Sequence, residues 1–310
     1  MKVGDTVVRK SYNRDITFKI IDIKQVDNNV IYVLNGVNLR IVADANIEDL
    51  EEVKEDSFGK AELVFNKKVN ESIRSIVNNR GNTSFKKKYR SIKQTKINSM
   101  DFDEGMSFRR PGKILHLDGD AAYLDVCLKV YKQLSIDAVG RVVLEREQPE
   151  QIVDIVKEVK PDIVVITGHD GISKETKDYT DLNNYRNSKY FVDSVARLRE
   201  YEPGYDNLVI YAGACQSYYE AILDAGANYA SSPERVLIHC LDPVFVCQKV
   251  AYTNIGEVVN IQDVVKNTIT GVKGVGGVQT RGKCREGYPK SIFVRKIKPQ
   301  GYICREVYLI

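Results

Sequence analysis

The stretch Asp162–Gly171, DIVVITGHDG, decides the fold class of this chain. Its apolar run Ile163–Thr167 ends in a glycine, a histidine, an aspartate and a second glycine. A short continuous apolar run bounded by small residues is typical of a strand buried on both faces of a parallel sheet. Gly168 lets the chain turn sharply out of that strand, which places His169 just beyond the strand end.

Strand and helix patterns alternate on both sides of this stretch. Apolar strands are predicted at 112–119, 137–145, 161–168, 206–213 and 235–241, and helices at 120–134, 148–160, 182–201, 214–227 and 243–253. This alternation predicts a three-layer αβα sandwich of the flavodoxin-like kind, with a mostly parallel sheet between the helices. Right-handed crossovers would place all strand carboxyl ends, and therefore the ligand-binding and catalytic groups, at one edge.

The chain divides into four parts by composition. Residues 1–55 are rich in β-branched and aromatic residues, with turn residues between short runs, and predict a small SH3-like β-barrel. Residues 56–110 are polar and basic and predict a short helix near 61–78 followed by a linker. Residues 111–290 form the α/β domain, and the alternating pattern of 291–310 predicts an added strand or tail.

Composition limits the possible partners. The net charge is only +4, from 46 basic and 42 acidic residues, and does not favour nucleic acid as a partner. No apolar run reaches the ~18 residues of a membrane span, and the first residues show no secretory signal. The six cysteines form no CxxC pair, so we expect a reducing cytoplasm and no metal or cofactor.

Two predicted strands end in residues of complementary chemistry. His169 follows one strand, and Cys215 follows the strand read at 206–213 after Gly213. If these strands are neighbours, the imidazole and the thiol share one edge of the sheet. Histidine can exchange a proton near neutral pH, and a thiol becomes a nucleophile when a base or a helix N-terminus favours the thiolate. Because Cys215 opens the predicted helix 214–227 and shares the sheet edge with His169, we expect both the helix N-terminus and the imidazole to favour its thiolate.

Other residues complete or compete with this arrangement. Backbone amides around the two strand ends could bind an oxyanion, and the candidates are Gly168, Asp170, Gly171 and Ala214. His239 and Cys240 are a rival pair, but neighbours in a strand point to opposite faces. A metal site of His169, Cys215 and His239 lacks close ligand spacing and a fourth ligand.

These motifs resemble those of a broad clan of cysteine peptidases and, more closely, those of one family of proteases. An apolar block with His169, then a second apolar block ending in Ala214-Cys215, resembles the caspase-like cysteine peptidases of clan CD. PGKILHLDGD, DIVVITGHD, LVIYAGACQS and GVGGVQTRG are similar to the YabG family of sporulation-specific proteases. The resemblance implies a caspase-like fold and a His169–Cys215 dyad. It departs from the caspase pattern because Asp170 separates His169 from a glycine, and Gly213 replaces residues typical of caspases and metacaspases.

The resemblance also implies a biological setting. It points to an enzyme made in the mother-cell cytoplasm during sporulation, which cleaves proteins of the spore coat or cortex and becomes associated with the forming coat. The rival interpretation is a non-catalytic scaffold of the spore coat, with a flavodoxin-like ligand-binding domain.

Clan members recognise a charged side chain before the scissile bond, and the strand at 112–119 ends in two carboxylates. We expect Asp120, ahead of Asp118, to bind a substrate arginine, with Asp242 as a further candidate. Either aspartate could instead cap the next helix or belong to a turn. The same preference predicts self-cleavage in the linker, at Arg80 or Arg90.

Overall fold

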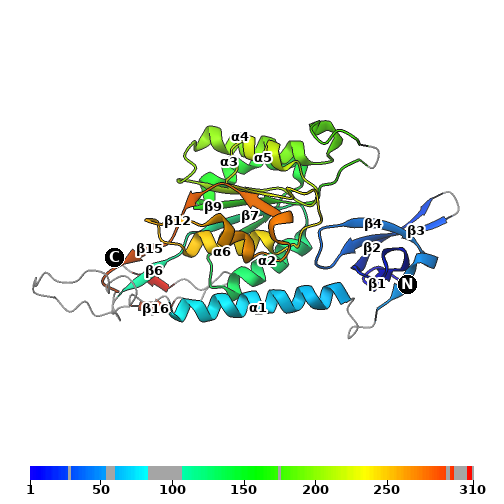
Figure 1. Ribbon diagram of the computed structural model, residues 1–310, viewed down its shortest axis with the longest axis horizontal. Helices are drawn as coiled ribbons and strands as arrows, with labels where there is room; N and C mark the ends of the chain where they lie inside the picture. The colour runs from blue at the N-terminus through cyan, green and yellow to red at the C-terminus, as the bar shows by residue number, and fades with distance from the viewer. Residues whose placement is uncertain are drawn as a thin grey trace, which may run out of the picture.

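The computed structural model describes residues 1–26, 29–53, 60–82, 107–173, 176–290, 294–296 and 306–308. Its two main sheets are a five-stranded antiparallel sheet near the N-terminus and a six-stranded, mostly parallel sheet formed by the rest of the chain (Figure 1). The helix α1 (Lys60–Asn82) lies along one side of the larger sheet's helical layer.

The N-terminal sheet has the order β4-β3-β2-β1-β5. Its strands are β1 (Thr6–Arg9), β2 (Thr17–Val26), β3 (Asn29–Gly36), β4 (Val42–Asn46) and β5 (Leu50–Glu52), with 3-10 turns at Lys10–Tyr12 and Ile47–Asp49. A small core of buried apolar side chains, including Val7, Phe18, Ile20, Leu34 and Leu50, stabilises it. The short strands match the sequence pattern, and their closure into an SH3-like barrel stays a prediction.

Helix α1 is longer than the pattern predicted. It spans 23 residues, Lys60–Asn82, instead of 61–78. Val69, Ile73 and Ile76 recur at helical spacing and pack against the core of the larger sheet. Arg80 therefore lies in the last turn of a helix, whereas Arg90 lies outside the described residues.

The larger sheet has the order β13-β11-β10-β9-β7-β8. The strands β7 (Ile114–Asp118), β8 (Ala138–Val142), β9 (Ile163–Thr167), β10 (Val209–Ala212) and β11 (Tyr229–Ser231) are parallel, and β13 (Val275–Gly277) is antiparallel at the edge. The mostly parallel sheet is thus confirmed. The parallel strands follow the 2-1-3-4-5 order of doubly wound sheets, with the change of direction between β7 and β9, where such sheets bind ligands.

Helices cover both faces of this sheet (Figure 1). Ile163 and Val165 of β9 face a core shared with α2 (Ala121–Gln133) and α6 (Asp242–Tyr252). Val164 and Ile166 face the opposite core, which contains side chains of α3 (Gln148–Val159), α4 (Ser188–Tyr201) and α5 (Tyr219–Asp224). The strand β9 is apolar from Ile163 to Ile166 because both of its faces are buried, and only its last residue, Thr167, is polar.

Smaller elements complete the described chain. A short α7 (Ile261–Lys266) and 3-10 turns at Glu145–Glu147, Leu182–Asn184 and Gly271–Lys273 connect larger elements. Three two-stranded pairs join β6 (Phe108–Arg110) to β15 (Arg285–Gly287), β12 (Val258–Val259) to β14 (Thr280–Arg281), and β16 (Val294–Lys296) to β17 (Glu306–Tyr308). The described part of the tail thus pairs with itself. Within the described residues, no helix is both long and apolar enough to cross a membrane.

Two expectations for the segment after β10 are wrong. The helix expected at 214–227 begins only at Tyr219, because Gly213 and Gln216 have φ of 106° and 56°, which a helix cannot accommodate. The strand expected at 235–241 is absent, and this segment makes only an isolated antiparallel bridge, from His239 to Leu39. The fifth parallel strand is β11, at Tyr229–Ser231. The helix expected at 182–201 also begins late, at Ser188.

Candidate active site

The parallel sheet brings the two strand ends together. Strand β9 pairs with β10 and with β7, and the registers place Ile166 opposite Ala212 and Thr167 opposite Asp118. His169, Cys215 and the carboxylates of 118 and 120 therefore follow three adjacent strand ends. The sheet edge that the sequence predicted as the site of chemistry holds these groups.

His169 is held by polar contacts on several sides. Its Nε2 lies 3.0 Å from Oδ2 of Asp120, and its backbone amide donates to Oε1 of Glu145 at 2.6 Å. The side-chain amide of Asn187 donates to its carbonyl oxygen, and the ring of Tyr123 lies beside the imidazole, with 5.7 Å between centroids. Since Nε2 faces Asp120, Nδ1 is the ring nitrogen left to face a reacting group.

Asp120 has two structural tasks. One carboxylate oxygen caps α2 by accepting from the amides of Ala122 and Tyr123, and the other accepts from the side-chain amide of Asn35 and faces His169. Burial would raise its pKa, but the hydrogen bonds to His169 and Ala122 outweigh burial and lower it. Asp120 is therefore ionised and already engaged, which disfavours the expected role as arginine partner.

Glu145 is a site residue that sequence reasoning missed. It lies so close to the two strand exits that a Cβ added to Gly119 or Gly168 would approach its Oε1 to 2.4 or 2.3 Å. Only glycine allows this carboxylate to reach the amide of His169. The strand-ending glycines could have signalled a close approach, but not which side chain approaches.

Cys215 is buried in a loop instead of opening a helix. Its side chain is 1% exposed, and its Sγ accepts a hydrogen bond from the amide of Ile238 at 3.2 Å. Burial raises its pKa to about 11, against hydrogen bonds from the backbone of Ile238 and Arg40. The expected dipole of a helix starting at Cys215 does not exist, because α5 begins at Tyr219 and has only six residues. The thiol is thus protonated in this arrangement.

Asp118 is the centre of a buried polar cluster. Its Oδ2 accepts from Thr167 Oγ1 at 2.7 Å, and its Oδ1 accepts from the amide of Asp120 at 2.9 Å. Nη1 of Arg40 lies 2.7 Å from the same Oδ2, and both side chains are fully buried. His116 Nε2, also buried, lies 2.8 Å from Thr167 Oγ1.

The charge of Arg40 keeps Asp118 ionised. Burial alone would raise the pKa of Asp118, but the guanidinium and the hydrogen bonds lower it well below its usual range. The pKa of Arg40 is raised by Asp118 despite burial. Asp118 is therefore already paired with a positive side chain, that of Arg40 from the loop between β3 and β4. Nothing in the sequence singles out Arg40 from the other basic residues.

Two of the predicted oxyanion donors are engaged elsewhere. The amide of Gly171 donates to Asp170, and the amide of Ala214 donates to Oγ of Ser217 at 2.8 Å. The Asp170 carboxylate also accepts from the hydroxyls of Ser188 and Ser217, so it ties the segments after β9 and β10 together. The extra residue between His169 and the next glycine thus has a structural task.

Asp242 is engaged within the fold. It is fully buried at the start of α6, where its oxygens accept from the amides of Ile269, Thr270 and His239. Its carboxylate organises the loop that carries His239 instead of facing a substrate. Among the described residues, no cluster of three or more His, Cys, Asp or Glu could hold a metal.

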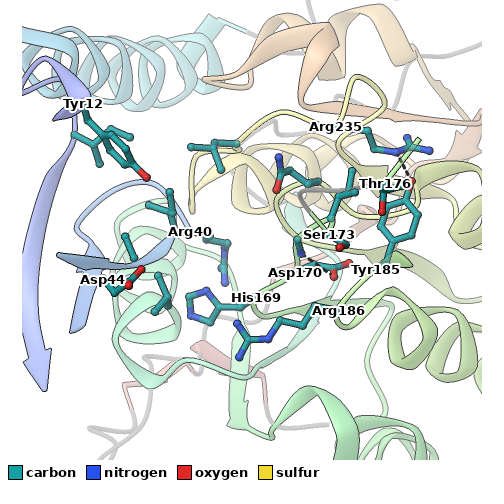
Figure 2. Close-up of a pocket in the computed structure, with 18 of the residues that line it drawn as sticks. Tyr12, Arg40, Asp44, His169, Asp170, Ser173, Thr176, Tyr185, Arg186 and Arg235 are labelled. Atoms are coloured by element: carbon teal, nitrogen blue, oxygen red, sulfur yellow. Dashed lines mark hydrogen bonds between the residues drawn. The ribbon is translucent and has the colours of Figure 1, made fainter. Parts of the chain in front are cut away.

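A groove of 1770 Å³ runs beside His169, between the N-terminal sheet and the larger domain (Figure 2). Tyr12, Arg40 and Asp44 line it from the N-terminal sheet, and the loops of His169 and Arg235 line it from the other side. The wall also includes Asp170, Ser173, Tyr185, Arg186 and Gln216. This groove is large enough for an extended peptide.

Comparison with known proteins agrees with the peptidase interpretation. The family model of the YabG peptidase U57 matches residues 2–289. The sporulation-specific protease YabG of Bacillus subtilis strain 168 is 42% identical over 289 residues, which cover 93% of this chain and 98% of the relative. No solved structure matches. The match spans the N-terminal sheet as well as the parallel one. The chain belongs to the YabG peptidase U57 family and is a peptidase.

Proposed function

We propose that the chain is a sporulation-associated cysteine endopeptidase with Cys215 as nucleophile and His169 as general base. The observation that carries this proposal is the pairing of β9 with β10, which sets His169 and Cys215 at neighbouring strand ends, with Asp120 on Nε2 of His169. A thiol, an imidazole and an orienting carboxylate are the parts that nucleophilic catalysis needs. This arrangement and the family favour a peptidase over a non-catalytic scaffold.

The mechanism follows from these positions. The proton of Cys215 passes to Nδ1 of His169, and the thiolate attacks the carbonyl carbon of the scissile bond. Backbone amides of Gly168 and Asp170 bind the oxyanion that forms. The imidazolium gives its proton to the leaving amine, and water then hydrolyses the thioester. Asp120 holds the ring in position and stabilises the imidazolium, as the third residue of a catalytic triad does.

The substrate side chain before the scissile bond is arginine, and Asp118 is its partner. The support is that Asp118 is ionised, buried at the end of β7 and already paired with a guanidinium. Asp120, the first choice from sequence, is engaged with His169, Asn35 and α2. An arginine in a desolvated pocket with a carboxylate gives strong selection against neutral and acidic side chains.

Several finer expectations belong to the same proposal. The similarity to a sporulation-specific protease supports spore-coat or cortex-associated proteins as substrates, and association with the forming coat. The three-layer arrangement supports a caspase-like fold for the parallel sheet. Self-cleavage at Arg80 requires the last turn of α1 to unwind, because a peptidase binds extended backbone, and Arg90 is the second candidate.

The test is digestion of an unstructured protein that contains arginine by the full chain and its Cys215→Ala variant, with the new termini mapped by mass spectrometry. We expect cuts after arginine that vanish in Cys215→Ala and persist in Cys284→Ala, which removes a buried cysteine outside the site. Cuts that persist in Cys215→Ala would reject the nucleophile. Cysteine-dependent cuts without arginine preference would reject the role of Asp118 alone.

A further inference from the structure

The loop between β3 and β4 crosses the candidate active site. Its residues Asn38 and Leu39 run antiparallel to residues 238–240, the segment whose Ile238 amide contacts the Cys215 thiol. The amide of Cys240 donates to the carbonyl oxygen of Asn38 at 3.1 Å, and Leu39 forms a β-bridge with His239. The hydroxyl of Tyr123 lies 2.7 Å from the carbonyl oxygen of Leu39. The loop between β3 and β4 thus binds along the site by backbone contacts.

The next residue reaches the catalytic groups. The backbone of Arg40 lies close enough to the Cys215 thiol to oppose the rise in its pKa, and its side chain enters the Asp118 pocket, where Nη1 also lies 3.5 Å from the carbonyl oxygen of Gly168. The guanidinium carbon lies 5.0 Å from the centre of the Tyr123 ring. Arg40 therefore has its backbone at the nucleophile and its side chain in the specificity pocket.

This is the arrangement in which a peptidase holds a substrate. Extended peptides add to exposed backbone by main-chain hydrogen bonds, while pockets for alternate side chains supply specificity. Here the backbone of Asn38 and Leu39 makes the main-chain contacts, and the Arg40–Asp118 pair corresponds to the side chain in its specificity pocket. The positions order Asn38, Leu39 and Arg40 as the three residues that precede a scissile bond.

We propose that Asn38–Arg40 occupies the substrate-binding cleft in place of a substrate, so that the N-terminal sheet keeps the peptidase latent until this segment is displaced. The proposal rests on the proposed function and identifies the preferred substrates as extended segments with an apolar residue before arginine. The loop is closed on itself, since the amide of Gly36 donates to the carbonyl oxygen of Ile41 at 2.8 Å. Both ends continue into paired strands, β3 and β4, which hold the segment in place.

The burial of Cys215 agrees with this latency. A thiol with a pKa of about 11 is almost entirely protonated at neutral pH, and reactive cysteines need the thiolate. The alternative is that Arg40 only ties two parts of the chain together. The two interpretations predict different results when the loop is removed from the cleft. If the loop keeps the enzyme latent, Cys215 becomes accessible to peptides that carry arginine, and if Arg40 is only structural, it does not.

The experiment measures covalent labelling of Cys215 in the full chain by an Asn-Leu-Arg acyloxymethyl ketone, followed by mass spectrometry of the intact protein. A matched Asn-Leu-Glu ketone reports selectivity. We expect Arg40→Ala to be labelled by the arginine reagent at least about tenfold faster than the parent, because labelling of a latent enzyme is slowed by the fraction of chains with an open cleft. The glutamate reagent should label both slowly.

A matched control and a second variant make the result specific. Arg14→Ala removes an arginine from the turn before β2, paired with Glu51 at 2.9 Å, and should label like the parent. Gly36→Ala retains both Arg40 and Asp118 but deforms the loop that carries Arg40, because its Cβ would approach the carbonyl oxygen of Leu39 to 2.3 Å. Gly36→Ala should also be labelled faster than the parent, and it tests the proposal if Arg40→Ala fails to fold.

The outcomes separate latency from catalysis. If folded Arg40→Ala and Gly36→Ala are labelled no faster than the parent while the chain still cuts proteins through Cys215, the latency proposal is overturned and the proposed function stands. If no variant is labelled or cuts any protein, the proposed function falls, and the inference falls with it. Thermal melting of each variant reports whether it is folded.

Discussion

Replacing Asp120 separates its contribution to stability from its proposed role in orienting His169. Asp120→Ala removes the cap of α2, which accepts from the amides of Ala122 and Tyr123, together with the hydrogen bond from Asn35 and the contact with His169. Loss of a cap costs about 1 kcal/mol, and loss of the Asn35 hydrogen bond about 1 kcal/mol more. We therefore expect Asp120→Ala to lower the free energy of unfolding by about 2 kcal/mol.

Asp120→Asn is the matched control. Asparagine caps helices as well as aspartate does, but its single oxygen cannot also accept from Asn35, so the free energy of unfolding should fall by only about 1 kcal/mol. It cannot stabilise an imidazolium by charge, and its amide can turn the ring of His169. Loss of an orienting carboxylate in a triad costs up to about 10⁴-fold in kcat, so we expect both variants to lose about 10²- to 10⁴-fold.

The assay measures kcat and KM on an arginine-containing peptide and urea unfolding at neutral pH, for the parent and both variants. The rates are also compared in the Arg40→Ala background, so that latency does not limit the measurement. A parent-like kcat in Asp120→Asn would refute the role of Asp120 in orienting His169. A loss of kcat only in the destabilised alanine variant would mean that Asp120 acts through the fold.

Three further predictions follow from buried contacts. Gly168→Ala places a Cβ 2.3 Å from Oε1 of Glu145 and would push this side chain away from the amide of His169, so we expect about 1 kcal/mol lower stability and reduced kcat, and unchanged unfolding in urea would contradict the close approach. Asp118→Asn leaves the buried Arg40 charge unpaired and should cost about 3 kcal/mol. Because the folded-state pKa of Asp118 is lowered, its ionised form stabilises the fold above about pH 4, and this contribution is lost as the pH falls through the folded pKa. The difference in the free energy of unfolding between the parent and Asp118→Asn, measured with urea, should therefore be constant from pH 7 to about 4 and become smaller below that. A difference that grows on acidification would be inconsistent with the lowered pKa. Iodoacetamide alkylation of Cys215 in the parent should rise about tenfold per pH unit toward pH 11, since burial raises its pKa, and a plateau near pH 7 would show that the thiol is not buried as described.

The parallel sheet and the edge that holds the site were predictable from local pattern. A strand such as β9, buried on both faces, is mainly apolar, and its neighbours repeat that pattern between amphipathic helices. The glycines at the strand ends mark where the chain leaves the sheet. These features predicted that His169 and Cys215 lie at one edge, because they depend on residues close together in the chain.

The errors arose where backbone conformation depends on distant contacts. The residues around Cys215 have helical character, but the loop adopts positive φ at Gly213 and Gln216 and the amide of Gln216 bonds to the carbonyl oxygen of Val236. The apolar segment around His239 reads as a strand, yet it bridges the N-terminal loop instead of joining the sheet. Local propensity cannot show such competition.

The sequence by itself determined the class of sheet, the order of its elements in the chain and the residue types that can perform the chemistry. Tertiary structure alone decided which carboxylate does what: Asp120 faces His169, Asp118 pairs with Arg40, and Asp170 joins two loops. Asp118 and Asp120 are alike in sequence, and their roles differ because burial and the charge or hydrogen bond of a distant partner set the protonation and contacts of each. Arg40 shows the same point most clearly, because only folding brings it to the active site.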